Sequence, residues 1–193
     1  MPSRTLPGGR VRSGLAGCLA GVVGSCGDAE PVPQGFRRIL AEFREVASSG
    51  RNDLHLSGVY WHLPFAYSPQ RRSRLNDAAL GMGFGRSLLD AKDNERGLLV
   101  QVSRSSHYKP QYAAGYWWLA RWRVVGDFAF GAGYTAFGFA RSDIYHYLPL
   151  PGAVPLLSLG TERATLYLTY LPRIHDAITG TGNVVYIYAR VRI

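Results

Sequence analysis

The feature that most constrains this fold is a change of hydrophobic period after residue 50. From there to the C-terminus, apolar residues recur at about every second position in eight segments. A period of two indicates β-strands whose two faces differ in polarity. The predicted strands are His55–Phe65, Ala78–Leu89, Gly97–Arg104, Ala113–Val124, Asp127–Ala140, Val154–Leu159, Arg163–Leu171 and Asn183–Ile193. The sequence therefore predicts an all-β fold.

The connections between these segments alternate strictly between long and short. Residues 66–77, 105–112, 141–153 and 172–182 are long and rich in Pro, Arg and Ser, whereas 90–96, 125–126 and 160–162 are short. Short turns at one end and long loops at the other are typical of outer-membrane barrels. An even number of strands brings both termini to the short-turn end. We expect an eight-stranded antiparallel transmembrane β-barrel.

Hydropathy and charge exclude two other classes of protein. Apolar residues make up 47% of the 193 residues, but no run approaches the roughly 20 that a membrane helix needs. A helical membrane protein is therefore excluded. The formal net charge is +9, yet no nucleic-acid-binding motif accompanies it. An anionic membrane surface fits this charge better than nucleic acid.

The N-terminus predicts export. Met1–Arg12 carries three arginines and no acid, and Ser13–Ser25 is small and apolar. This pattern indicates a cleaved signal peptide over 1–27, followed by a single barrel domain over 28–193. The segment Val23–Cys26 also resembles a lipoprotein cleavage box, so ordinary cleavage and lipidation of Cys26 both remain open.

One segment, Gln34–Ser49, has the period of an amphipathic helix and is followed by Gly50. Arginines and glutamates occupy its other face. We expect this helix to lie against the barrel wall and the membrane interface. Its apolar stripe consists of Phe36, Ile39, Leu40, Phe43, Val46 and Ala47.

Candidate chemistry lies where the first predicted strand ends. His62 is in the middle of the aromatic stretch Val59–Tyr67, and the topology brings it to the same rim as Ser105 and Ser106. A histidine that activates a hydroxyl, with a hydroxyl or amide that stabilises an oxyanion, is a minimal set for acyl transfer. The alternative is a histidine that only hydrogen-bonds a neighbour. No Gly-x-Ser-x-Gly motif is present.

Prolines and glycines predict features of the barrel wall. Pro149, Pro151 and Pro155 surround the start of the sixth strand, and Pro172 ends the seventh. Because proline donates no hydrogen bond to the ladder, we expect interrupted pairing here, and in a bilayer a side opening for a lipid tail. Glycines at every second position predict space inside the barrel; these are Gly81, Gly83, Gly85, Gly131 and Gly133.

An ordered set of motifs resembles the lipid A palmitoyltransferases of the Gram-negative outer membrane, the PagP family. The motifs run in order along nearly all of the chain after the signal. They are Trp61-His62-x-x-Phe65-Ala66-Tyr67, Arg74-x-Asn76-Asp77, Gly83-Phe84-Gly85, Gly97-Leu98, Ala114-Gly115-Tyr116, Tyr147-x-Pro149-Leu150-Pro151, Pro155-Leu156, Gly160, Thr169-Tyr170-x-Pro172 and Gly182-Asn183-Val184.

The resemblance implies an outer-membrane acyltransferase. It implies that a palmitoyl chain moves from the sn-1 position of a glycerophospholipid donor to a hydroxyacyl chain of lipid A. The acyl chain would lie inside the barrel, the active rim would face outside, and neither a cofactor nor a metal would take part. We expect a monomer with no nucleic-acid partner.

The resemblance also assigns candidate catalytic residues. The family's catalytic histidine matches His62, and its serine matches Ser106. Ser105 stands where the family has an aspartate. Several explanations remain open: another rim carboxylate such as Asp77 or Asp143 substitutes, the histidine is oriented without an acid, or this loop aligns with a gap.

The resemblance also assigns the prolines of the family's lateral gates and the residue at the floor of its acyl-chain pocket. The family's gate prolines match Pro149, Pro151, Pro155 and Pro172, whereas Ser57 replaces a first-strand proline. The family's pocket floor is a glycine, and the residue here is Trp117, which alternation points inward. We hypothesise that Trp117 shortens the accepted chain below palmitoyl, unless the glycines across the barrel compensate.

Two rival functions remain at this point. One is a non-enzymatic outer-membrane barrel, such as an adhesin or membrane stabiliser, and the other is a soluble lipid-binding barrel of the lipocalin kind. Both share the predicted strand number, and fold alone does not choose between them.

Overall fold

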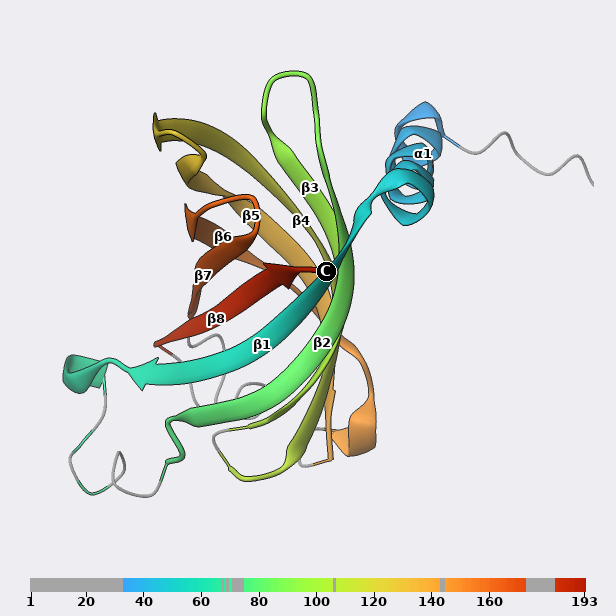
Figure 1. Cartoon of the computed structure of the whole chain (residues 1–193). Coiled ribbons are helices and arrows are strands. Elements are labelled where there is room, and N and C mark those ends of the chain that lie inside the picture. Colours follow the sequence, from blue (N-terminus) through green and yellow to red (C-terminus); the bar gives the residue numbers. More distant parts are fainter. Residues whose placement is uncertain are drawn as a thin grey trace, which may run out of the picture.

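The computed structural model describes residues 33–66, 68, 70, 75–105, 107–142, 145–172 and 183–193. Within them, eight strands form a closed barrel in which all neighbours are antiparallel and β1 pairs with β8 (Figure 1). The strands are β1 (Arg51–His62), β2 (Ala78–Leu89), β3 (Glu95–Arg104), β4 (Pro110–Val125), β5 (Phe128–Arg141), β6 (Leu150–Gly160), β7 (Ala164–Leu171) and β8 (Val184–Arg192). The predicted barrel is confirmed. The expected signal peptide with Cys26, and the residues Ser106 and Asp143, lie outside the described residues.

The largest departures from the predicted strand bounds are in β1 and β6. β1 begins at Arg51 rather than His55, and it ends at His62 rather than Phe65 because Pro64 starts a short 3₁₀ turn, η1 (Pro64–Ala66). β6 begins at Leu150 rather than Val154. The Pro155 carbonyl accepts a hydrogen bond from Thr169 Oγ1 of β7, so the backbone of Pro155 faces β7. β6 therefore keeps its full pairing with β5 despite its prolines.

The strands separate an apolar outer wall from a mixed interior. Leu80, Met82, Val100 and Trp122 point outward and are more than half exposed. A continuous exposed apolar wall of this kind suits contact with lipid. Inside, a cluster of large side chains fills the middle of the barrel: Trp117, Leu119, Leu156, Tyr167 and Tyr188.

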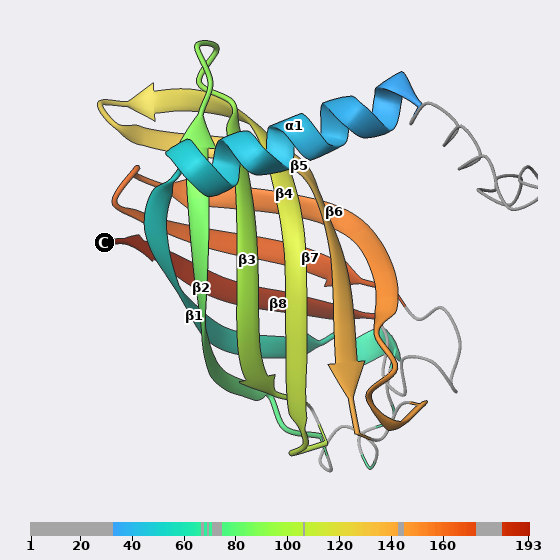
Figure 2. The same cartoon turned by 90° about the vertical axis from the view of Figure 1, so that its right-hand side faces the viewer.

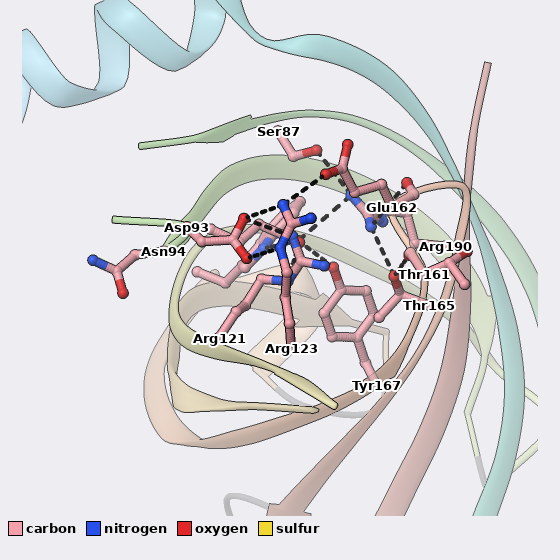
Figure 3. A network of polar contacts seen from close by, with 12 residues as sticks. Ser87, Asp93, Asn94, Arg121, Arg123, Thr161, Glu162, Thr165, Tyr167 and Arg190 are labelled. Carbon is pink, nitrogen blue, oxygen red and sulfur yellow. Dashed lines mark hydrogen bonds and ion pairs between the residues drawn. The ribbon is translucent and has the colours of Figure 1, made fainter. Parts of the chain in front are cut away.

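Buried charges fill the barrel at its short-turn end (Figure 3). Arg190 is fully buried, and its Nη1 lies 3.6 Å from Asp53 Oδ1 and 3.5 Å from Glu95 Oε1. Arg190 also donates to Ser87 Oγ and Thr165 Oγ1, at 3.0 and 2.7 Å. Close ion pairing is the usual condition under which charges are buried. We call Asp53, Glu95, Arg121, Arg190 and Arg192 the ionic plug.

The plug continues into the turn between β2 and β3. There Asp93 Oδ2 accepts a hydrogen bond from Arg123 Nε at 2.9 Å. This bond holds the pKa of the Asp93 carboxyl below its usual value. Ion pairs therefore connect the turn at the surface to the buried charges inside the short-turn end of the barrel.

The helix α1 (Gln34–Ser49) lies on the outside of the barrel, across its wall near the short turns (Figure 2). Arg86 of β2 donates hydrogen bonds to the carbonyls of Ala47 and Gly50 at its C-terminal end. The Phe43 ring packs on Tyr116 of β4 at 5.1 Å. In the described part of the chain, no helix is long and apolar enough to span a bilayer. The predicted helix bounds and its docking on the wall are both confirmed.

Candidate active site

His62 is the last residue of β1, at the long-loop end of the barrel and away from the ionic plug. Its side chain is fully buried. β1 pairs with β8 as far as His62, opposite Val184, but the β1–β2 ladder stops at Val59. On the ladder, His62 is therefore held by β8, at the point where the β1–β2 ladder has ended.

Asp77 provides the carboxylate for this histidine. His62 Nδ1 lies 2.7 Å from Asp77 Oδ1. Asp77 immediately precedes β2, and its carbonyl accepts a hydrogen bond from the Tyr60 N–H at 2.7 Å, which fixes it against β1. An Nδ1–H donated to a carboxylate leaves Nε2 as the basic nitrogen and stabilises the imidazolium when it forms. Of the open explanations, the structure favours Asp77.

Ser105, which stands at the position of the family's catalytic aspartate, bonds backbone groups of its own loop. It is buried, and its Oγ accepts the backbone N–H groups of His107 and Lys109 at 3.3 and 3.2 Å. Its own N–H donates to the Lys109 carbonyl at 2.8 Å. Ser105 thus shapes the loop between β3 and β4, next to Ser106.

A cavity of about 200 Å³ occupies the half of the barrel nearer the long loops. Its walls include Leu99, Gly115, Phe137 and Val154, and they reach Val184, the β8 partner of His62. These walls are mainly apolar, which suits a hydrocarbon chain. The cavity therefore extends from Val184, next to His62 on the ladder, toward the core cluster in the middle of the barrel.

A few polar groups interrupt the cavity wall. Gln101 Nε2 donates to Ser57 Oγ at 2.8 Å and to the Tyr186 hydroxyl at 2.7 Å. Gln101 and Tyr186 both line the cavity. Ser57, which replaces a proline of the family, therefore points its hydroxyl into the barrel. The register of β1 is irregular between Ser57 and Val59.

Trp117 does not itself line this cavity but lies behind residues that do. It is buried inside the barrel, as the alternation of β4 predicts. It belongs to the same core cluster as Tyr188, and Leu99 packs against that cluster. Because Tyr188 and Leu99 also line the cavity, the indole lies one layer of side chains beyond the cavity, toward the short-turn end, and its role as the floor stays a prediction.

The β6–β7 ladder is short, as expected from the prolines, whereas the side opening for a lipid tail stays a prediction. The ladder runs only from Leu156–Thr169 to Gly160–Thr165, so within the described residues the part of β6 from Leu150 to Val154 has no ladder partner in β7. Pro151 and Pro172 line the cavity at this gap, whereas Pro149 borders a groove on the outer face.

The expectation for the five spaced glycines is wrong in one respect. None of them lines the cavity. A Cβ at Gly85 would lie 2.7 Å from the His55 ring, and one at Gly83 would lie 2.9 Å from Gln101 Cβ. The missing side chains make room for inward-pointing neighbours instead of leaving empty space.

The sequence analysis did not identify Glu95, which lies between the cavity and the short-turn end of the barrel. Its Oε1 accepts the Trp117 Nε1–H at 3.0 Å. No local motif signals this contact, because the two residues come from different strands. The register of β3 and β4, which pairs Gly97 with Trp117, would have been needed to find it.

Comparison with known proteins agrees with this geometry. Residues 42–190 match the sequence model of PagP, described as antimicrobial peptide resistance and lipid A acylation protein. The chain is 37% identical over 158 residues to the lipid A acyltransferase PagP of Bordetella pertussis (strain Tohama I), covering 82% of this chain and 85% of that protein. It is 37% identical over 142 residues to the enzyme of the same name from Edwardsiella tarda, covering 72% and 74%. The PagP of Cronobacter sakazakii is likewise 37% identical over 142 residues, with 72% and 71% covered. By these matches over most of its length, this chain belongs to the PagP family.

Proposed function

We propose that this protein transfers an acyl chain of palmitoyl length or somewhat shorter from the sn-1 position of a glycerophospholipid to a hydroxyacyl chain of lipid A. Acyl transfer to lipid A is the activity that the names of its relatives state. The observation that carries the proposal is the His62–Asp77 pair beside an apolar cavity. Such a pair supplies a base, and such a cavity accepts a hydrocarbon chain.

In the proposed mechanism, His62 Nε2 removes the proton from the acceptor hydroxyl. The acceptor oxygen attacks the donor ester carbonyl, and the imidazolium is stabilised by Asp77 at 2.7 Å. The tetrahedral intermediate collapses with cleavage of the sn-1 ester, and the proton passes from His62 to the departing lysophospholipid oxygen. One ester forms and one breaks, so atoms and charge balance without a cofactor.

Ser106 has two possible roles in this proposal. It either donates a hydrogen bond to the oxyanion or relays the proton, and a covalent acyl-serine is the alternative route. A donor incubated without acceptor distinguishes these routes. An acyl-enzyme accumulates under those conditions only if Ser106 is the nucleophile.

The proposed location is the bacterial outer membrane, with the His62 rim facing outside and the protein acting as a monomer. The exposed apolar wall supports a lipid surrounding. The gap between β6 and β7 supports sideways access for the donor's acyl chain. A signal peptide over 1–27 and a barrel domain over 28–193 belong to the same proposal.

The test is transfer in detergent micelles that contain lipid A and a phospholipid labelled in its sn-1 chain. The wild type is expected to label lipid A, and His62→Gln is expected to abolish labelling while the barrel stays folded. His146→Gln, which changes an exposed histidine of the connection between β5 and β6, is the matched control. No labelling by the wild type would favour the rival non-enzymatic or lipid-binding barrel. Full labelling by His62→Gln would remove His62 as the base.

A further inference from the structure

The indole of Trp117 lies across the neighbouring strand. The β3–β4 register places Trp117 opposite Gly97, and a Cβ at Gly97 would lie only 2.1 Å from Trp117 Cζ2. The ring therefore occupies the volume that a side chain at Gly97 would need. Only glycine at this position admits the observed ring orientation.

Glu95 holds this ring from the short-turn side of the barrel. It is two residues before Gly97 on β3, so both positions face the interior. Its Oε1 accepts the indole Nε1–H at 3.0 Å and also accepts the Tyr167 hydroxyl. A buried indole N–H without an acceptor is unfavourable, so this bond selects one ring orientation.

The Glu95 carboxylate is itself fixed by the ionic plug. Arg190 Nη1 lies 3.5 Å from Oε1, and Arg121 Nε lies 3.9 Å from Oε2. Arg190, Arg121 and Tyr167 converge in this part of the barrel (Figure 3). A chain of contacts thus runs from buried arginines through Glu95 to the indole behind the cavity wall.

We propose that Glu95 is a positioning residue for acyl-chain selection. By holding the Trp117 indole over Gly97, it supports Leu99 and Tyr188, which pack with the indole and line the end of the cavity where the acyl chain would stop. This inference deepens the proposed function and rests on it. The competing explanation is that Glu95 acts only as a counter-ion to Arg190 and Arg121.

The test compares Glu95→Gln with Glu95→Met in transfer assays with saturated sn-1 donors graded in steps of two carbons. Both variants remove the charge and have similar length, but only glutamine retains an oxygen acceptor for the indole. Glu95→Gln is expected to keep the wild-type ranking of donors. Glu95→Met is expected to reduce discrimination against the donor two carbons longer than the best one by roughly tenfold. A counter-ion role predicts the same change in both variants.

A second variant keeps the test decisive if Glu95→Met does not fold. Trp117→Phe removes the indole N–H from the other side of the bond, together with part of the ring volume, and leaves Glu95 with its arginines. It is expected to loosen discrimination in the same direction. The proposal is overturned if Glu95→Met and Glu95→Gln rank donors identically, or if Trp117→Phe ranks them as the wild type does. Failure of the proposed function is distinguishable, since the wild type would then transfer no donor at all.

Discussion

At the scale of single residues, the candidate chemistry depends on a contact between two segments. His62 ends β1, and Asp77 precedes β2 at the far end of a long loop. The sequence predicted His62 from its position in an aromatic strand end, but it offered Asp77 only as one of several explanations. Loop conformation decides which carboxylate reaches an imidazole, and no local periodicity encodes that. Ser106 stays a prediction.

The first residue-scale prediction concerns Asp77. In Asp77→Asn, an amide replaces the carboxylate that lies 2.7 Å from His62 Nδ1, so the imidazolium loses its counter-charge. The rate of acyl transfer is expected to fall by about 10²- to 10⁴-fold. Initial rates with saturating donor measure this, and Asp127→Asn in the exposed β4–β5 turn is the control. A rate within error of the wild type would show that Asp77 does not assist the histidine.

The second residue-scale prediction concerns Trp117. Trp117→Gly removes the indole that packs behind the cavity-lining Leu99 and Tyr188, so the cavity is expected to deepen. The rate ratio of longer to shorter donors is expected to rise by roughly tenfold or more. Competition between two donors in one assay measures this ratio independently of how much protein is folded. An unchanged ratio would eliminate Trp117 as the floor.

At the scale of elements, hydrophobic period predicted the helix and every strand of the barrel. The helix Gln34–Ser49 and the strand Ala78–Leu89 have their predicted bounds. Prolines caused the error at the start of β6, because β6 tolerates Pro151 where it has no ladder partner in β7 among the described residues. Which part of a strand lacks a neighbour in a closed barrel depends on how the strands pair, and the pattern of a single strand does not show this.

The element-scale prediction concerns how α1 is attached. Arg86 donates to two carbonyls at the C-terminal end of the helix, so Arg86→Ala removes both bonds. The free energy of unfolding is expected to fall by about 1.5–3 kcal/mol while the barrel itself still forms. Urea unfolding in lipid vesicles measures the loss, with the exposed Arg44→Ala of the same helix as control. Equal stability of the two variants would contradict a role for Arg86 in holding the helix.

At the scale of the whole molecule, the barrel has two ends of opposite character. The short-turn end is filled by the ionic plug, whereas the long-loop end carries the cavity and the His62–Asp77 pair. The sequence predicted which end carries the chemistry, because loop lengths alternate. It did not predict the plug, since Asp53, Glu95 and Arg190 come from three different strands.

The whole-molecule prediction concerns this plug. Arg190→Met leaves the buried carboxylates of Asp53 and Glu95 without their shared cation. The free energy of unfolding is expected to fall by about 3–5 kcal/mol. Unfolding in the same vesicles measures this, and the exposed Arg163→Met is the matched control. A stability equal to the control would mean that the other arginines alone neutralise these carboxylates.

The central claim is that His62 drives acylation of lipid A at the rim of a lipid-embedded barrel. Mass spectrometry of lipid A from cells producing either the wild type or His62→Gln tests it most directly. The account predicts a mass increase of one acyl chain with the wild type and none with the variant, at equal levels of folded barrel. Lipid A of unchanged mass with the wild type, or equally acylated with both proteins, would contradict it.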